Sequence, residues 1–180
     1  MRSVNKLFLG LLVILITACA EADKREPAIY LLPENYKGSF YIIFNIPKGK
    51  FPKYENDSRI YEIPENGILL TQADTNEGWI DRNKVKFFYV DGDGSRTEIT
   101  ERWTTSLHDT PENRGDNRIT IFGGGVGVFE PINGCQVYEQ PFIIGTKSDV
   151  LDGKVYFDIY GPKGIKDMDK SIFKDACNDQ

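Results

Sequence analysis

The apolar residues of this chain recur mainly with the period of two that is typical of β-strands. Short alternating or apolar runs are separated by clusters of Gly, Pro, Asn and Asp, which favour turns. The runs that we expect to form strands are 39–46, 59–63, 67–72, 84–91, 96–101, 118–122, 126–129, 136–138, 142–146 and 154–160. Eight to ten short strands at this spacing predict a mainly β fold, an antiparallel β-sandwich.

Helical periodicity is found near the C-terminal end. Met168, Ile172 and Phe173 recur at helical spacing within 167–176, and Cys177 follows directly. We therefore predict a short helix of one to three turns in this segment. The pattern shows neither an internal repeat nor a second domain, so residues 28–180 are expected to form one domain, which is long enough for a core.

The first 18 residues follow a different pattern. Arg2 and Lys6 precede an apolar run at 7–16, which is half the roughly 20 residues that a membrane-spanning helix needs. Small residues and Cys19 follow, and this order is typical of a secretory signal peptide. The stretch Leu15-Ile16-Thr17-Ala18-Cys19 resembles the lipobox of bacterial lipoproteins. The resemblance implies cleavage before Cys19 and acylation of its thiol and its new amino group.

The lipobox resemblance divides the chain into three parts. Residues 1–18 become a lipoprotein signal peptide, 19–27 an acylated cysteine with a flexible tether of small and charged residues, and 28–180 the folded domain. The lipid bilayer is then a partner, through the lipid on Cys19. Because Ala20 rather than aspartate follows the cysteine, analogy with sorting in enteric bacteria favours the outer membrane over the inner one. The domain would lie in the bacterial cell envelope, periplasmic or surface-exposed.

The charge of the chain excludes one class of partner. The formal net charge is −5, and removal of Arg2 and Lys6 with the signal peptide makes it more negative. The backbone of a nucleic acid demands a stripe of Lys and Arg, which the sequence lacks. We therefore expect no nucleic-acid partner, and we expect the lipid alone to provide the anchoring.

The cysteines suggest a cross-link. Acylation of Cys19 would leave Cys135 and Cys177 as an even pair in an oxidising compartment. A disulfide between them would fix the C-terminal segment to the sheet, and two separate buried thiols are the alternative.

One acidic segment resembles the first positions of a calcium-binding loop. Asp91 and Asp93 alternate in Asp91-Gly92-Asp93-Gly94-Ser95, but Arg96 and Arg102 stand where an EF-hand needs glycine and glutamate. A hairpin turn explains Asp-Gly equally well. Asp91 and Asp93 are thus candidates for a cation site with a structural alternative, and we expect no metal or other cofactor.

Two further segments could contribute to chemistry. The glycine-rich stretch 123–127 matches no phosphate-binding pattern, so bends or bulges are the expected role, with close approach of a ligand to bare backbone as the alternative. His108 is the only histidine. The sequence contains neither a nucleophile elbow nor a second histidine for a zinc site, so we interpret His108 as a solvated loop residue.

Aromatic residues near loops are candidates for recognition. Tyr36, Trp79 and Trp103 are expected beside loops, as is Tyr30, rather than in the middle of strands. Such rings offer much contact area at little cost in rotamer entropy, which suits a protein or glycan partner. The alternative is that they close the ends of the sandwich.

Two segments resemble known families. Leu32-Pro33-Glu34-Asn35-Tyr36-Lys37-Gly38, with 59–72 and 87–99, is similar to an uncharacterised family of secreted and lipid-anchored proteins, common in Bacteroidetes, which has a Leu-Pro-Glu-x-Tyr-Lys-Gly motif. The likeness covers about 28–105 and implies no catalytic residue. The Tyr-x-Ile-Pro-x-x-Gly pattern at 61–67 resembles transthyretin-like β-sandwich modules.

These observations favour a lipid-anchored envelope protein that acts as a non-enzymatic binding or structural module. One alternative is an envelope hydrolase that acts on glycan or peptide, with acidic residues near the glycine-rich stretch and His108. Another is an immunity or stress protein that binds a second secreted protein.

Overall fold

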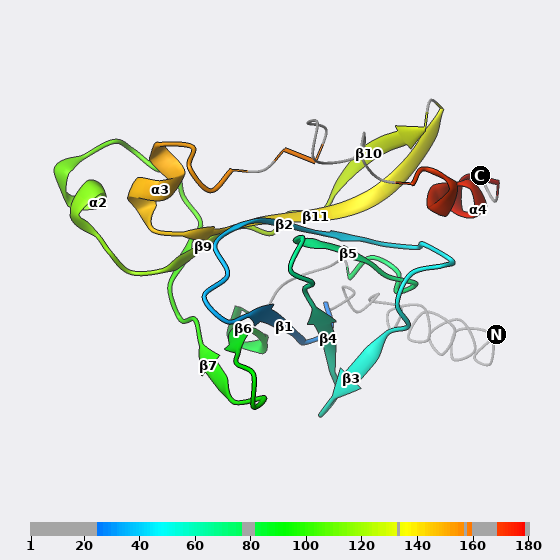
Figure 1. Ribbon diagram of the computed structural model, residues 1–180, viewed down its shortest axis with the longest axis horizontal. Helices are drawn as coiled ribbons and strands as arrows, with labels where there is room; N and C mark the ends of the chain where they lie inside the picture. The colour runs from blue at the N-terminus through cyan, green and yellow to red at the C-terminus, as the bar shows by residue number, and fades with distance from the viewer. Residues whose placement is uncertain (1–24, 77–81, 133, 157, 160–168, 179–180) are drawn as a thin grey trace, which may run out of the picture.

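The computed structural model describes residues 25–76, 82–132, 134–156, 158–159 and 169–178 (Figure 1). The predicted signal peptide, Cys19 and Trp79 lie outside these residues. Two β-sheets form stacked layers, and short helices lie on the outer side of one of them.

The five-stranded sheet contains, in spatial order, β3 (Lys53–Glu55), β4 (Ser58–Glu62), β1 (Ala28–Pro33), β6 (Val85–Val90) and β7 (Arg96–Glu98). The six-stranded sheet contains β5 (Ile68–Leu70), β2 (Gly38–Ile43), β11 (Cys135–Gly145), β9 (Thr120–Gly123) and β8 (Arg102–Trp103), with β10 (Gly127–Ile132) also paired to β11. The helices are α2 (Pro111–Gly115), α3 (Lys147–Leu151) and α4 (Ser171–Asn178), and a 3₁₀ turn spans Arg82–Lys84.

The predicted β-sandwich class is confirmed, but its sheets are mixed rather than antiparallel throughout. β1 runs parallel to β4 and β6, β2 to β5, and β8 to β9. The chain passes from one sheet to the other between β1 and β2 and again between β2 and β3. Such crossovers bring strands of one sheet into the same direction, whereas the hairpin between β6 and β7 gives an antiparallel pair.

Most predicted strands are found, with five differences. β1, β3 and β8 were not expected, and the two runs at 136–138 and 142–146 form the single strand β11. The strand predicted at 154–160 is wrong for its described residues, which form turns and irregular chain outside both sheets. There Val155 lies against Gly145 of β11, and Ile159 is fully buried. The alternation of apolar residues in this segment therefore reflects packing against a sheet and not strand pairing within one. The predicted C-terminal helix is present as α4.

The central part of the six-stranded sheet is buried on both faces, as the burial of successive residues of β2 shows. Its inner face packs against the five-stranded sheet through a core that includes Phe40, Ile42 and Phe142. Its outer face packs against α4 and Ile159, through a second core that includes Ile43 and Phe173. This two-sided burial explains why the run from Ser39 to Phe44 is almost continuously apolar.

Arg25 and Glu26, the first two described residues, both contact Asn76. The Nε of Arg25 donates to the backbone oxygen of Asn76. Glu26 N donates to Asn76 Oδ1 at 2.9 Å, and Asn76 Nδ2 donates to Glu26 O at 2.9 Å. The buried side chain of Asn76 thus fixes the last residues before β1, within the segment that we assigned to the tether.

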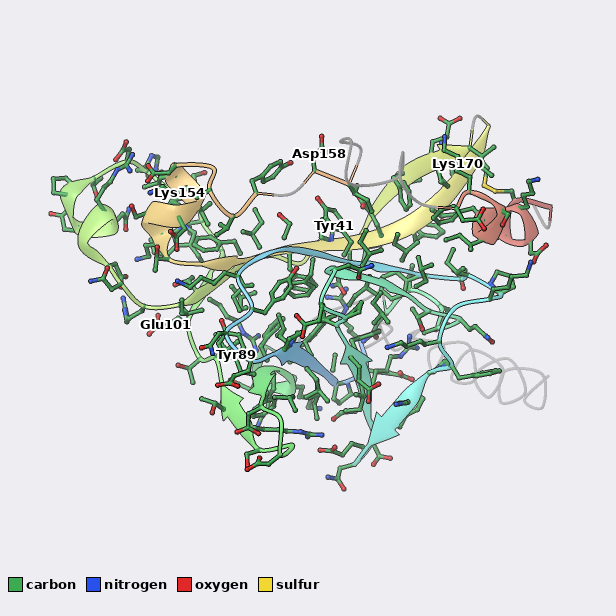
Figure 2. All side chains as sticks on the ribbon, in the orientation of Figure 1. Tyr41, Tyr89, Glu101, Lys154, Asp158 and Lys170 are labelled. Atoms are coloured by element: carbon green, nitrogen blue, oxygen red, sulfur yellow. A yellow bond between two sulfur atoms is a disulfide. The ribbon has the colours of Figure 1, made fainter. Side chains whose placement is uncertain are left out.

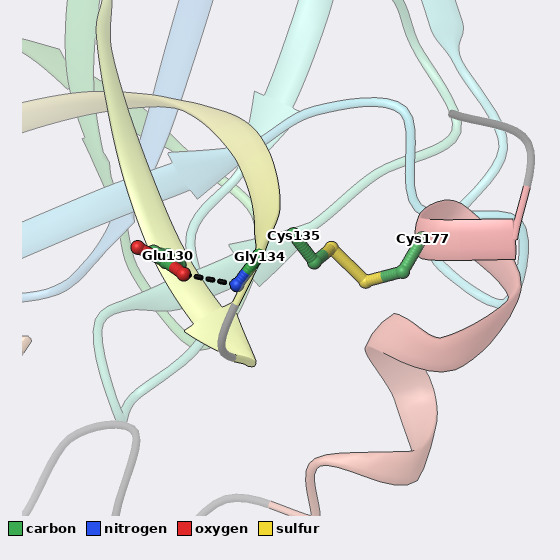
Figure 3. The surroundings of a disulfide bond; sticks show 4 residues. All are labelled: Glu130, Gly134, Cys135 and Cys177. Carbon is green, nitrogen blue, oxygen red and sulfur yellow. Dashed lines mark hydrogen bonds between the residues drawn. A yellow bond between two sulfur atoms is a disulfide. The ribbon is translucent and has the colours of Figure 1, made fainter.

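The two cysteines of the domain lie at disulfide distance. Cys135 opens β11 and Cys177 lies in the last turn of α4, with their Cα atoms 5.4 Å apart (Figure 3). Gly134 N donates to the carboxylate of Glu130 and closes the neighbouring turn between β10 and β11. A bond at this position would hold α4 over the second core.

Loss of the cross-link should weaken the fold. Since Cys135 and Cys177 are 42 residues apart, chain entropy gives an upper limit of about 4 kcal/mol for the loss in unfolding free energy. We expect Cys177→Ser, Cys135→Ser and the double variant to lose the same amount, measured by urea unfolding. Reduction of the wild type should reproduce the loss and add about two hydrogens to the mass. Two free thiols in the unreduced protein would contradict the bond.

Glu139 provides a pH test of the second core. It lies on the outer face of β11, only 8% exposed, and its Oε2 has no hydrogen-bond partner among the described residues. Burial raises the pKa of Glu139, and the charge of Asp158 raises it further. Figure 2 shows Tyr41 directed toward the segment that includes Asp158, and Tyr41 Oη accepts from Ile159 N at 3.4 Å.

Because the folded-state pKa of Glu139 is raised, the folded protein keeps a proton that the unfolded chain loses. Stability should therefore fall as the pH rises from about 4.3, the ordinary glutamate pKa, through the raised one. Glu139→Gln should remove this contribution to the slope and increase the stability at neutral pH, measured by thermal unfolding between pH 4 and 8. Glu98→Gln, on an exposed strand, is the matched control. An unchanged slope in Glu139→Gln would refute the assignment.

Candidate functional site

A pocket lies between the two sheets, beside the edge strand β8, with a cavity volume of about 100 Å³. The six-stranded sheet contributes the glycine-rich turn after β9 and the two residues of β8, and the five-stranded sheet contributes β1 and β6. Residues more than a hundred positions apart therefore share its walls. The pocket is the strongest candidate for a functional site because buried polar groups and apolar walls meet there.

Gln140 of β11 lines the pocket and links two parts of its wall by hydrogen bonds. It is 2% exposed. Its Oε1 accepts from Tyr30 Oη at 3.0 Å, and its Nε2 donates to Gly124 O at 2.9 Å. Burial raises the pKa of Tyr30 well above its usual range, so that hydroxyl is a neutral donor. One buried amide thus joins β1 to the glycine-rich turn.

The glycines give this turn its shape. Gly123 and Gly124 have φ values of 89° and 100°, which favour glycine. A Cβ on Gly124 would lie 2.7 Å from Phe142 Cε1, and a Cβ on Gly123 would lie 2.8 Å from Pro141 O. β9 and β10 both run antiparallel to β11, and the three residues between Gly123 and Gly127 stand opposite the two between Glu139 and Phe142. This glycine-rich turn is therefore a bulge between two strands, one of the two roles that we expected, and its bare backbone also borders the pocket.

Aromatic rings form the inner wall. Tyr30 stacks on Phe87 with ring centroids 4.5 Å apart, and Phe142 meets Tyr30 edge-on at 5.0 Å. The rings contact one another closely, so they support the cavity rather than project from it.

The charged groups of the pocket are basic. Arg102 places its guanidinium carbon 4.9 Å from the centre of the Phe87 ring, and Arg25 lies on the wall beside the start of β1. None of the described lining residues is an aspartate or glutamate. A cationic pocket in a chain of net charge −5 favours an anionic ligand.

Trp103 brings a buried donor to the same place. Its indole Nε1 is buried and has no acceptor among the described residues. Lys147 Nζ lies 4.0 Å from the centre of its ring and pairs with Asp116 at 2.9 Å. Trp103 is therefore held on one side by a cation while its N–H lacks a partner.

Of the two aromatic candidates that the structure describes, Trp103 lines the pocket and Tyr36 does not. Tyr36 Oη donates to Ser39 O at 2.7 Å, and Tyr36 O accepts from Tyr89 Oη at 2.9 Å, so Tyr36 stabilises the turn between β1 and β2. Trp79 lies outside the described residues. Tyr30 was expected beside a loop, and this was wrong: it is buried in β1.

The acidic turn has a structural explanation. Ser95 N donates to Asp91 Oδ1 and to Asp93 Oδ1, both at 2.8 Å, in the hairpin between β6 and β7. Hydrogen bonds from Ser95 lower the pKa of Asp93 to about 2. Among the described residues no group of three His, Cys, Asp or Glu side chains could hold a metal ion.

His108 is exposed in the loop before α2, where its backbone oxygen accepts from Asn113 Nδ2 at 2.9 Å. The neighbouring Asp109 instead pairs with Arg114, through contacts of 2.7 and 2.8 Å. The geometry therefore does not bring this carboxylate to the histidine as a catalytic partner.

Sequence reasoning missed Gln140, Arg25 and Arg102. A polar residue at an inward position of the apolar strand β11 was the signal that could have identified Gln140. The two arginines had no such signal, because their approach depends on how the strands pair.

Comparison with known proteins gives three findings. A family model described as "Family of unknown function (DUF6843)" matches residues 24–136. No curated protein sequence matches significantly. A crystal structure described as "Putative Lipoprotein from Bacillus anthracis" superposes with a TM-score of 0.50 at 17% identity, over 68% of this chain and 71% of that one. At this identity the likeness concerns the fold. In the described part of the chain, no helix has the length and apolarity to cross a bilayer.

The glycine-rich turn can be tested by a matched pair of substitutions. Gly124→Ala should cost about 1–3 kcal/mol of unfolding free energy, because it strains the backbone and crowds Phe142. Gly125→Ala should be nearly neutral, since a Cβ there meets nothing within 4 Å. Urea unfolding of both variants measures the difference. Equal stabilities would contradict the described geometry of the turn.

Proposed function

The chain belongs to the Family of unknown function (DUF6843), and from this premise we propose that it is a lipid-anchored envelope module that binds a ligand without transforming it. The pocket at the glycine-rich turn is the proposed binding site. Two independent lines support this proposal, one from the N-terminal sequence and one from the pocket.

The anchor is supported by sequence and by analogy. Cys19 ends a lipobox-like stretch, and the structural relative is described as a lipoprotein. Ala20 after the cysteine and the motif at 32–38 favour the outer membrane of a Bacteroidetes-type cell. Acyl chains on one residue contribute roughly 0.8 kcal/mol per buried methylene, which suffices to hold the domain at a bilayer.

The residue types that line the pocket are the main support for a binding function. Its described lining residues include no histidine, cysteine or carboxylate, so it lacks the nucleophile–base or acid–base pair that a hydrolase needs. It instead presents donors on rigid strands. The hydrolase alternative would find carboxylates in the neighbouring pocket lined by Glu98 and Glu101, but Glu101 is paired with Arg118 at 2.7 Å.

The pocket favours some partners over others. Neutral glycans usually stack on exposed aromatic faces, but Tyr30, Phe87 and Phe142 pack against one another here. Basic and apolar groups together suit an anionic group of a protein or small molecule. A partner that is another secreted protein, the second alternative, is compatible with this site.

The anchor has a direct test. Cys19→Ala should prevent acylation and move the protein from the membrane fraction to the soluble fraction of lysed cells. Cys177→Ser, which leaves the lipobox intact, should remain with the membranes. Mass spectrometry of the mature N-terminus gives the modification itself. If Cys19→Ala still sediments with membranes, the anchoring proposal fails.

A further inference from the structure

We propose that the pocket at the glycine-rich turn binds a carboxylate that bears a compact apolar group. The inference rests on the proposed binding function and adds the chemical class of the ligand. Such a group exists at the C-terminus of a peptide and in small free acids.

The first argument is charge. Two guanidinium groups, from Arg25 and Arg102, belong to the lining, and the described lining contains no acidic side chain. Stacking on Phe87 uses the face of the Arg102 guanidinium, whereas its N–H donors lie in the plane of the group. A planar carboxylate matches this fork of donors.

The second argument is the balance of donors and acceptors. Gln140 has already committed its oxygen to Tyr30 and its nitrogen to Gly124. The buried indole N–H of Trp103 lacks an acceptor among the described residues. Because this N–H is closed off from solvent, a ligand would not bond to it directly, and the arginines are the lining groups that an anion would pair with. The indole ring lines the pocket, so its N–H serves as a reporter of binding.

The third argument is size. The cavity of about 100 Å³ is lined by Phe87, Ile121 and Phe142 next to the donors. An engineered apolar cavity of roughly 150 Å³ holds benzene, so a branched group of about three to five carbons is the expected fit. A whole acyl chain of a membrane lipid is too large for this volume.

The fourth argument is access. β8, which includes Arg102 and Trp103, is an edge strand of its sheet. An extended peptide can add along such an edge and place its terminal carboxylate in the pocket. A free acid would use only the pocket.

The mature chain in detergent, labelled with ¹⁵N, allows a specific test with N-acetyl-L-leucine as the probe. Titration should shift the indole N–H resonance of Trp103, which Trp79→Phe distinguishes from the other tryptophan. N-acetyl-L-leucinamide, which has the same shape without the charge, should bind at least tenfold more weakly.

The arginines provide variants for the same titration. Arg102→Gln and Arg25→Gln should each weaken binding of N-acetyl-L-leucine by tenfold or more. Arg96→Gln is the control, because Arg96 pairs with Glu55 on the other sheet. Arg25 precedes the first strand, so its variant tests the charge even where Arg102→Gln fails to fold.

The outcomes separate the two proposals. Equal binding of acid and amide, or full affinity in both arginine variants, would overturn the carboxylate and leave the binding function in place. No shift with either compound or with a short peptide ending in leucine would overturn both. A peptide that binds tighter than N-acetyl-L-leucine, and loses this gain when C-terminally amidated, would identify a peptide C-terminus as the source. Equal affinity would identify a small acid.

Discussion

The six-stranded sheet must be covered on both faces, and the rest of the structure depends on this constraint. In β2 the side chains of Phe40 and Ile42 enter the core between the sheets, while Tyr41 and Ile43 enter the core under α4. Either face alone would expose a large apolar surface to water. The five-stranded sheet covers one face, and α4 with Ile159 covers the other. The helix α4 is therefore part of the core, and the pairing of Cys135 with Cys177 holds it in place.

The sequence allowed much of this arrangement to be predicted where the signal is local. The apolar run of β2, the Asp-Gly turn between β6 and β7 and the helix with Phe173 follow from periodicity and turn chemistry. The strand at 154–160 was wrong for its described residues, because a segment that packs against a sheet can bury alternate residues as a strand does. β8 could not be found, since two residues show no period.

The pocket was predictable only in parts. The glycine-rich stretch and Trp103 attracted attention from sequence alone, but Gln140 and Arg102 did not. The parallel pairs of β1 with β6 and of β8 with β9 bring these residues together, and the antiparallel pair of β9 with β11 completes the site. Such pairings join positions far apart in the chain, where local periodicity contains no information. Tyr36, by contrast, proved to stabilise the turn that its own motif forms.

The anchor and the pocket are close to each other in the covalent chain. Arg25 lines the pocket and follows Cys19 by six residues, a stretch that reaches about 20 Å when fully extended. If Cys19 bears the lipid, Arg25 cannot lie farther than this from the residue that enters the bilayer surface. The pocket would then sample ligands at the membrane surface rather than in the bulk of the compartment. A weak affinity for a small terminal group suffices there, because confinement to the same surface raises the effective concentration of a membrane-associated partner.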